Sequence, residues 1–408
     1  MSPTPAFAPD PADPWKGVNP FTPAFREDPH PGLAYLRAHH PVDATPIGMW
    51  RVTRYADCVR MLRETPTGVR LANGTSRGEA FLPADLGPGR FMLSQDPPNH
   101  TRLRKLVAKA FTPRAVERLR ASVQSLADGL VDRALEKGEL DVIAGLALPV
   151  PSTVICEMMG VPLSDRGMFT EWTARATHLL AAPMLPPDRL EAGIAASRAL
   201  NGYFKDLVAE RRRSPREDML TDLVRASDED ERMSPEELLT QCSGLLIAGF
   251  ETTIGLIGNG VLQLARHPAE LAKLRANPGL IGSAVEECLR FDGPILLTIR
   301  VVREDARFGD VVIPRDREVV IMLAAANRDP AKFPEPERFD VAREPNEHLA
   351  FGGGTHFCLG AHLARMEAQV AIGTLVRRAA KLEPPSGPLE MGASLFRVLA
   401  RLPMRVSA

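Results

Sequence analysis

A glycine-rich stretch near the C-terminus, residues 351–365, constrains this chain more than any other segment. It reads Phe-Gly-Gly-Gly-Thr-His-Phe-Cys-Leu-Gly-Ala-His-Leu-Ala-Arg, so one cysteine, Cys358, separates a run of glycines from an apolar segment with helical spacing. Glycines remove side-chain bulk and let a flat ligand lie against the main chain. A helix beginning after Cys358 directs free N–H groups and the positive end of its dipole at the sulfur, and both favour a thiolate. Such a thiolate suits an axial ligand to haem iron, although a lone cysteine before a helix is more often inert core filling.

The whole stretch resembles the haem-binding loop of the cytochrome P-450 monooxygenases, whose pattern is Phe-Gly-x-Gly-x-His-x-Cys-x-Gly followed by Ala-Arg. The matching residues are Phe351, Gly352, Gly354, His356, Cys358, Gly360, Ala364 and Arg365. The resemblance implies haem b as the cofactor, with Cys358 as the metal ligand and with Phe351, Gly352, His356 and Gly360 around it. It also implies the fold of that family, which is mainly α with a small β portion. In that fold a triangular prism of helices surrounds a buried haem, and a long central helix binds oxygen.

Size and charge narrow the class of protein. The chain has 408 residues, 44% of them hydrophobic, which is enough for a large buried core. No Ser/Gly linker or internal repeat divides it, so we expect a proline-rich N-terminal arm (residues 1–30) and a single haem domain (residues 31–408). Lysine and arginine number 50 against 51 acidic residues, a net charge of −1, which argues against binding to nucleic acid or to anionic membranes.

The cysteines and the N-terminus predict a cytoplasmic location. Five cysteines are dispersed without CxxC or zinc-ligand spacing, which fits a reducing compartment better than a disulfide framework. The first thirty residues contain neither a basic-then-apolar signal pattern nor a stretch long enough to span a bilayer. We expect a monomer that does not associate with membranes.

The remaining pattern predicts mostly helices with a few strands toward the C-terminal half. Residues 64–95 carry many prolines and glycines and form a long loop, and such loops are usually functional or mobile. Residues 96 to about 280 are nearly all helical in pattern. A short strand pair is expected near residues 49–53, and further strands at residues 298–302, 311–313 and 319–322, the last two forming a hairpin across the turn 314–316.

The clearest helix start is Ser234, where Pro235 suits the first helical position and Glu237 completes a capping box. The next breaker is Pro268, which predicts a helix of about 32 residues. Its charged and polar residues, Glu251 among them, argue against a membrane span.

Within this helix lies the sequence Ala248-Gly249-Phe250-Glu251-Thr252-Thr253, which is a poor choice for helix stability. The Thr252 hydroxyl can bond to the Ala248 carbonyl and open the helix locally, which taken alone predicts a simple kink. Beside the haem-loop resemblance, the segment resembles the family's oxygen-binding groove. The resemblance implies Ala248 and Gly249 against the cofactor, with Glu251 and Thr252 as the catalytic proton-relay pair.

Glu287 and Arg290 stand three residues apart on one helical face, a spacing that by default means a weak surface ion pair. The resemblance instead implies the family's structural Glu-x-x-Arg pair, which locks the following meander behind the haem. We assign Arg338 as the third member of that group, with Arg343 as a rival.

Haem propionates call for cationic donors. His100 and Arg104 lie four residues apart at a predicted helix start and in isolation indicate only a solvated face. The resemblance implies that they bind propionate, together with His356 and Arg300.

We expect an apolar substrate site because an oxidant that attacks C–H bonds needs few competing hydroxyls nearby. By position, its candidate walls are the loop 64–95, the segment around residues 179–185, and Leu245, Ala248, Leu296, Leu297, Leu395 and Phe396. The predicted reaction is hydroxylation or epoxidation of a hydrophobic small molecule by O2, and steroids, terpenoids, fatty acids and polyketides all remain open.

No flavin or iron–sulfur module accompanies the resemblance, so we expect electrons from a separate ferredoxin and ferredoxin reductase. The candidate docking cations on the cysteine side are Arg102, Lys105, Arg114 and Arg365. Three alternatives stay open: a peroxide-driven peroxygenase, which the Glu251–Thr252 pair argues against, a non-catalytic haem-thiolate sensor, and a haem-free helical binding protein.

Overall fold

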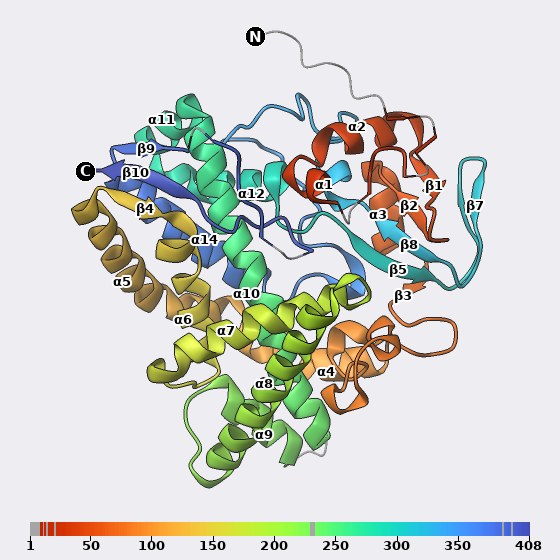
Figure 1. The fold of residues 1–408 in the computed structure, drawn as a ribbon, viewed down its shortest axis with the longest axis horizontal. Helices are drawn as coiled ribbons and strands as arrows, with labels where there is room; N and C mark the ends of the chain where they lie inside the picture. The colour runs from red at the N-terminus through yellow and green to blue at the C-terminus, as the bar shows by residue number, and fades with distance from the viewer. Residues whose placement is uncertain are drawn as a thin grey trace.

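The computed structural model describes residues 9–10, 12–13, 15–19, 22–228, 233–385, 387–392 and 395–408. Most of the chain is helical, and the long helix α10 (Pro235–Arg266) crosses the middle of the molecule. Figure 1 shows the longer helices on one side of the molecule and the largest sheet with the N-terminal helices on the other. The other helices are α1 (Pro23–Glu27), α2 (His30–His39), α3 (Tyr55–Arg63), α4 (Asn99–Val107), α5 (Pro113–Lys137), α6 (Pro149–Met158), α7 (Arg166–Thr177), α8 (Pro187–Arg213), α9 (Met219–Asp228), α11 (Pro268–Ala276), α12 (Ile281–Asp292), α13 (Leu323–Ala326) and α14 (Ala361–Arg378).

The start of α10 is set by the predicted capping box. Ser234 Oγ accepts from the Glu237 amide at 3.1 Å, and a Glu237 carboxylate oxygen accepts from the Ser234 amide at 2.9 Å. The helix spans 32 residues, so the predicted start and length are confirmed. By length and mean hydropathy (1.5 over 18 residues) α10 could cross a membrane, but 72% of that window is buried inside the protein, which indicates a core helix. The helix is unbroken through residues 248–252, so the predicted local opening does not interrupt it.

The largest sheet has five strands in the order β1-β2-β8-β5-β3, with β2 and β8 parallel and the other neighbours antiparallel. A second sheet joins β4, β10 and β9, so the C-terminal strand pairs with two distant segments. The strands are β1 (Val42–Ala44), β2 (Trp50–Val52), β3 (Thr67–Gly68), β4 (Glu139–Asp141), β5 (Thr298–Val302), β6 (Ala306–Phe308), β7 (Val311–Ile313), β8 (Glu318–Ile321), β9 (Lys381–Glu383) and β10 (Pro403–Ser407).

The predicted hairpin between residues 311–313 and 319–322 is wrong. β7 pairs instead with β6, and β8 lies between β2 and β5. The turn that closes the true hairpin is Gly309-Asp310, where Gly309 has a φ of +58°. A two-residue turn of this kind, with a left-handed glycine, matches the twist of paired strands. The residues of β8 are largely buried, as a central strand requires.

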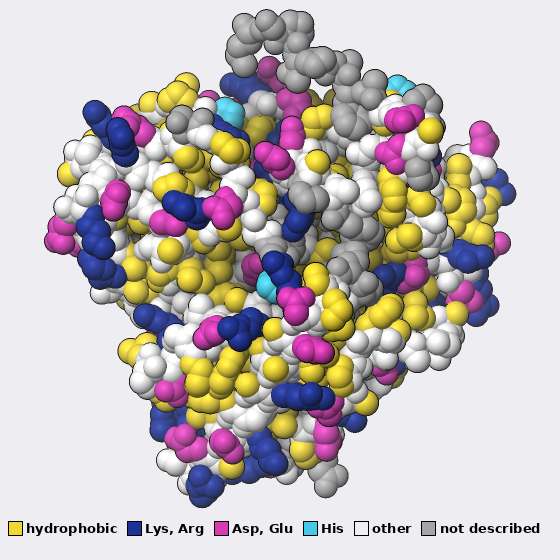
Figure 2. All heavy atoms as spheres, in the orientation of Figure 1, with side chains coloured by type: hydrophobic (Ala, Val, Ile, Leu, Met, Phe, Trp, Pro, Cys, Tyr) yellow, Lys and Arg dark blue, Asp and Glu magenta, His cyan; other side chains and the backbone are white. Residues whose placement is uncertain are grey.

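The largest hydrophobic cluster surrounds α10 with residues from α5, α6, α8, α12 and α14. Two smaller clusters lie beside the five-stranded sheet, and one of them contains Val18 and Phe25 from the predicted N-terminal arm together with Leu33 and Leu36 of α2. Val18 and Phe25 therefore attach the described part of this arm to the body of the protein. Figure 2 shows basic and acidic side chains interspersed on one face, as the near-zero net charge leads one to expect.

A buried acid on α14 makes stability depend on pH. Glu367 is buried, and this burial raises its pKa from 4.5 to about 8. Between these values the unfolded chain releases a proton that the folded state keeps, so stability falls as the pH rises from about 5 to about 8. Each unit of the shift corresponds to roughly 1.4 kcal/mol.

We therefore predict that Glu367→Gln gains stability over the wild type as the pH rises through this range, as measured by denaturant unfolding at several pH values. Glu383→Gln, which removes an exposed acid on β9, is the matched control. A stability difference between Glu367→Gln and the wild type that stays constant with pH contradicts the prediction.

Candidate active site

The loop before α14 folds back on itself around Cys358. The Cys358 amide donates to the Phe351 carbonyl at 3.0 Å, and α14 begins three residues after the cysteine. No heavy atom of the described chain lies within 4 Å of the position that a Cβ would take on Gly352 or Gly360. Gly354 has a different role, because its Cβ would collide with the carbonyl of Leu62 in α3. Gly352 and Gly360 therefore leave a face of the loop free for a ligand, whereas Gly354 lets the loop pack against α3.

The groups around the Cys358 sulfur shift its pKa in opposite directions. Cys358 is exposed as a residue, but the protein atoms around its sulfur desolvate the thiol and raise its pKa. The Gly360 amide and the guanidinium groups of Arg104 and Arg365 lower the pKa, and desolvation has the larger effect. The helix start acts in the predicted direction but does not produce a thiolate unaided. Coordination to a metal ion deprotonates a thiol outright.

Four residues predicted to hold propionates come together beside this loop. The rings of His100 and His356 lie 4.2 Å apart between centroids, and Arg104 donates to the carbonyl of Phe357 at 2.7 Å. Burial lowers the pKa of His100, and burial together with the charge of Arg300 lowers the pKa of His356 to about 3. Both imidazoles are therefore neutral near pH 7.

Several buried nitrogen atoms in this set have no hydrogen-bond partner among the described residues. Both ring nitrogens of His100 and Nδ1 of His356 are buried and make no hydrogen bond within the described part of the chain. Arg300 is buried and donates only to the Thr298 hydroxyl and the Ile299 carbonyl, with no ion pair to a described carboxylate. Unpaired buried donors are costly unless a ligand satisfies them, and an anionic group fits this set. The residues present thus suit haem propionates near Cys358.

The middle of α10 supplies the other predicted residues. Ala248, Glu251 and Thr252 are only partly buried and Gly249 is exposed, whereas the helix from Thr253 to Leu264 is buried throughout. The Thr252 hydroxyl donates to the Ala248 carbonyl at 3.0 Å, as predicted. Thr253 makes the same bond to Gly249 at 3.0 Å, but its side chain lies in the buried part of the helix. Residues 248–252 are thus the less buried part of a continuous helix, and we call them the open segment.

The predicted substrate walls stay predictions. Leu245 and Phe396 pack with the main cluster, and Leu296 and Leu297 pack with the N-terminal cluster beside the sheet. Leu395 is partly buried. A groove of about 1050 Å³ lies elsewhere, between α5, β4 and β10, and none of the predicted site residues lines it.

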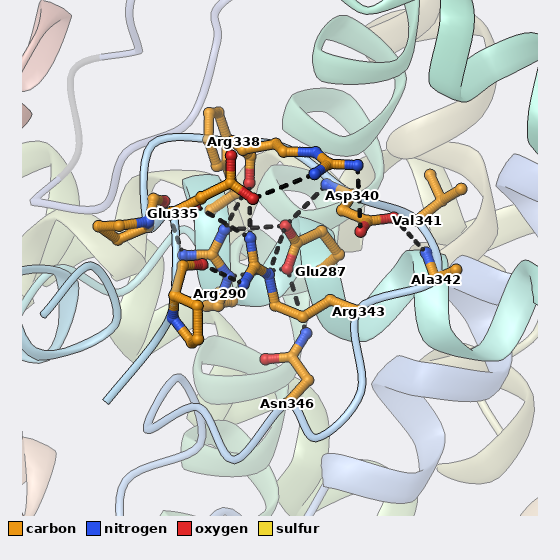
Figure 3. A network of polar contacts seen from close by, with 12 residues as sticks. Glu287, Arg290, Glu335, Arg338, Asp340, Val341, Ala342, Arg343 and Asn346 are labelled. Atoms are coloured by element: carbon orange, nitrogen blue, oxygen red, sulfur yellow. Dashed lines mark hydrogen bonds and ion pairs between the residues drawn. The ribbon is translucent and has the colours of Figure 1, made fainter. Parts of the chain in front are cut away.

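Behind the loop, Glu287 and Arg290 form a fully buried ion pair rather than a surface one. Two guanidinium nitrogens of Arg290 lie 2.7 and 2.8 Å from the carboxylate, and Arg290 also donates to the carbonyls of Asn327, Pro336 and Arg338. The same carboxylate accepts from the Asp340 amide and the Asn346 side chain (Figure 3). This group joins α12 to the meander that precedes the Cys358 loop.

The assignment of Arg338 as third member is wrong, and Arg343 takes that place. Arg343 Nε lies 3.2 Å from Glu287 and its side chain is 10% exposed, whereas the Arg338 side chain is 54% exposed and pairs with Glu335 (Figure 3). Arg338 contributes its carbonyl, which accepts from both Arg290 and Arg343. The sequence offers the two arginines at similar spacing, and the path of the meander decides between them.

Two of the four predicted docking cations are already paired. Arg365 binds Glu286 through two bonds of 2.7 Å and lies over the Phe351 ring at 4.5 Å, and His348 Nε2 lies 3.1 Å from the same carboxylate. Arg102 points to Glu237 at the start of α10. Lys105 and Arg114 are exposed and keep their predicted role as candidates.

Comparison with known proteins agrees with this geometry. A model of the family described as Cytochrome P450 matches residues 76–278 and 279–391. Cytochrome P450 107B1 of Saccharopolyspora erythraea is 42% identical over 407 residues, covering 95% of this chain and 97% of that protein. Vitamin D(3) 25-hydroxylase of Pseudonocardia autotrophica is 41% identical over 397 residues, covering 94% and 95%. The solved structure of P450BioI in complex with hexadec-9Z-enoic acid ligated acyl carrier protein has a TM-score of 0.86 at 37% identity, covering 94% of this chain and 99% of that one.

The chain therefore belongs to the cytochrome P450 family. It is a P450 monooxygenase, and its cofactor is the haem b of that family, with iron bound by a cysteine thiolate. The predicted fold class, a mainly α protein with a small β portion, is confirmed. Of the residues that bear on the site, sequence reasoning missed Arg343 as the main choice, and also the Glu286 and His348 partners of Arg365.

The Glu287 group allows a paired test of the correction. Arg343→Met removes one of two arginines from a buried carboxylate and is predicted to cost roughly 3 kcal/mol, in the range for breaking a buried pair. Arg338→Met removes only an exposed ion pair and is predicted to cost less than about 1 kcal/mol. Urea unfolding of both variants measures the difference, and equal losses contradict the assignment of Arg343.

Proposed function

We propose that this P450 hydroxylates or epoxidises a hydrophobic small molecule, with electrons from a ferredoxin and its reductase. The observation that carries the proposal is the open segment of α10, where Glu251 and Thr252 stand on the partly exposed part of a helix that is otherwise largely buried. An acid next to an alcohol at such a partly exposed position is an arrangement for moving protons.

Haem, when bound, supplies the site at which O2 is reduced and activated. The residues that would hold it are Cys358 through its sulfur, Gly352 and Gly360 through their open backbone faces, and the propionate set His100, Arg104, Arg300 and His356. Phe351 positions the loop, because its carbonyl accepts from the Cys358 amide and its ring stacks under Arg365.

Thr252 is oriented by its own helix. Its proton bonds to the Ala248 carbonyl, which leaves lone pairs of Oγ1 available to accept a second hydrogen bond. Rotation of the hydroxyl turns the same oxygen into a donor. Glu251, the preceding residue, is partly open and can exchange protons with solvent and pass them to Thr252.

The relatives support a hydrophobic substrate but do not indicate which compound it is. One relative is named for vitamin D(3), and one neighbour was solved with a fatty acid on an acyl carrier protein. Steroids, terpenoids, fatty acids and polyketides are therefore the classes to screen first. We further propose a cytoplasmic monomer organised as a single haem domain, with the electron donor docking near Lys105 and Arg114.

The absorption spectrum tests the assignment of Cys358 as the thiolate ligand of haem. The reduced wild-type protein under carbon monoxide is predicted to show the absorption band of a haem-thiolate complex, and Cys358→Ser is predicted to lose that band. A variant that keeps both the band and its turnover contradicts the role of Cys358.

The role of Thr252 has a matched control in the next residue. Thr252→Ala is predicted to lower product formation by at least about tenfold while reductant is still consumed and hydrogen peroxide is released, because the proton donor is lost. Thr253→Ala removes an identical bond to the helix but is predicted to keep normal coupling. The measurement is product and peroxide formed per reductant consumed.

Normal coupling in Thr252→Ala contradicts the proposed proton role. Turnover of the wild type with hydrogen peroxide that matches turnover with ferredoxin favours the peroxygenase alternative instead. Haem binding without turnover of any screened compound favours the sensor.

A further inference from the structure

A second carboxylate on α12, Glu286, binds the helix that follows Cys358. It accepts from Arg365 Nε and from a terminal guanidinium nitrogen of Arg365, both at 2.7 Å. Two parallel bonds of this kind fix the plane of the guanidinium as well as its distance. Burial raises the pKa of Glu286, but hydrogen bonds from Arg365 and His348 outweigh it and lower the pKa from 4.5 to about 2. The carboxylate is therefore charged near pH 7.

His348 connects the same carboxylate to the main chain of the Cys358 loop. Its side chain is 2% exposed, its Nδ1 accepts from the Ala350 amide at 3.2 Å, and its Nε2 lies 3.1 Å from Glu286. Because Nδ1 accepts a hydrogen bond, the proton of the neutral ring is on Nε2, where it is donated to Glu286. Phe351, the residue after Ala350, accepts from the Cys358 amide. One imidazole thus holds the acid and the loop in a single arrangement.

Arg365 acts on the Cys358 sulfur through its charge. Desolvation raises the pKa of the Cys358 thiol, whereas the charges of Arg104 and Arg365 lower it. The Arg365 guanidinium also lies over the Phe351 ring, 4.5 Å from its centroid, so its position relative to the loop is fixed. The side chains of Arg365 and Glu286 are 28% and 24% exposed, and water therefore screens their charges only in part.

The two charges of this pair have opposite effects on the reduction of a haem bound at Cys358. Reduction by one electron makes the site more negative, so a nearby positive charge favours the reduced state and a negative charge favours the oxidised state. Arg365 thus favours reduction and Glu286 opposes it. The carboxylate limits how strongly the guanidinium withdraws electron density from the sulfur.

We propose that Arg365 and Glu286 form a charge pair that sets how strongly Cys358 donates electrons to haem iron. Both are positioning residues, because they act through Cys358 and its loop. This role goes beyond the docking role that the sequence predicts for Arg365. The inference rests on the proposed role of Cys358 as the iron ligand.

The reduction potential of the haem-loaded protein tests the sign of each charge. Arg365→Gln removes the positive charge and is expected to lower the ratio of reduced to oxidised haem at a fixed potential about tenfold, which is about 59 mV for one electron. Glu286→Gln leaves Arg365 without its counter-charge and is expected to raise the ratio about threefold. The double variant is expected to lie between the two single variants. The measurement is a spectroelectrochemical titration at one pH and one ionic strength.

Variants that keep the charges separate an electrostatic role from a structural one. Arg365→Lys and Glu286→Asp change the geometry of the pair but not its charges, and both are expected to stay within about twofold of the wild-type ratio. Glu171→Gln on α7 is the matched control, because it removes an acid that pairs with an arginine at 2.6 Å but is 60% exposed. It is expected to keep the wild-type potential.

The outcomes distinguish the inference from the proposed role of Cys358. Suppose that the reduced wild type under carbon monoxide shows the haem-thiolate band. Shifts of the two neutral variants in the same direction, no shift in either, or equal shifts in the charge-keeping variants then overturn the charge pair, while the role of Cys358 stands. If the wild type lacks the band, the role of Cys358 falls and the inference falls with it.

Discussion

The carboxylate of Glu287 is the interaction on which the site depends most. Because it is fully buried, it needs several donors, and it finds them in Arg290, Arg343, the Asp340 amide and Asn346. Arg290 in turn holds the carbonyl of Asn327, whose side chain accepts from the Leu349 amide at the entrance to the Cys358 loop. A buried acid on α12 thus determines where the sulfur lies, through main-chain bonds rather than through contact with it. Such a group is strongly destabilised when one partner is removed.

Helix caps and side-chain patterns predicted those helices and strands whose ends depend only on nearby residues. The Ser234 capping box and the two flanking prolines placed α10, and the runs of β-branched residues placed β5 and β7, because capping and side-chain pattern act within a few residues. The partner of each strand could not be read in this way. β8 was expected beside β7, but it is a buried central strand and needs neighbours on both edges, which β2 and β5 provide.

The site shows the same division. The residues of the Cys358 loop and of the α10 segment follow from motifs, since each motif is a short run of sequence. The sequence does not decide between Arg338 and Arg343, because the choice depends on which side chain the folded meander turns toward α12. The contacts of Gln241 could not be predicted for another reason. Its partners are main-chain atoms of residues 90 and 92, which carry no signature in their side chains.

Three parts of α10 have different structural roles. The N-terminal part of α10 holds residues 90–92 through Gln241 and Gly244, the middle presents Glu251 and Thr252, and the remainder packs against α12 and α14 as core. The segment that contacts Phe91 is close to the proposed proton-relay residues, because Gly244 lies one turn before Ala248. The acceptor of the Thr252 hydroxyl is that same Ala248 carbonyl. The part of α10 that fixes residues 90–92 and the part that orients Thr252 are consequently close together on one continuous helix.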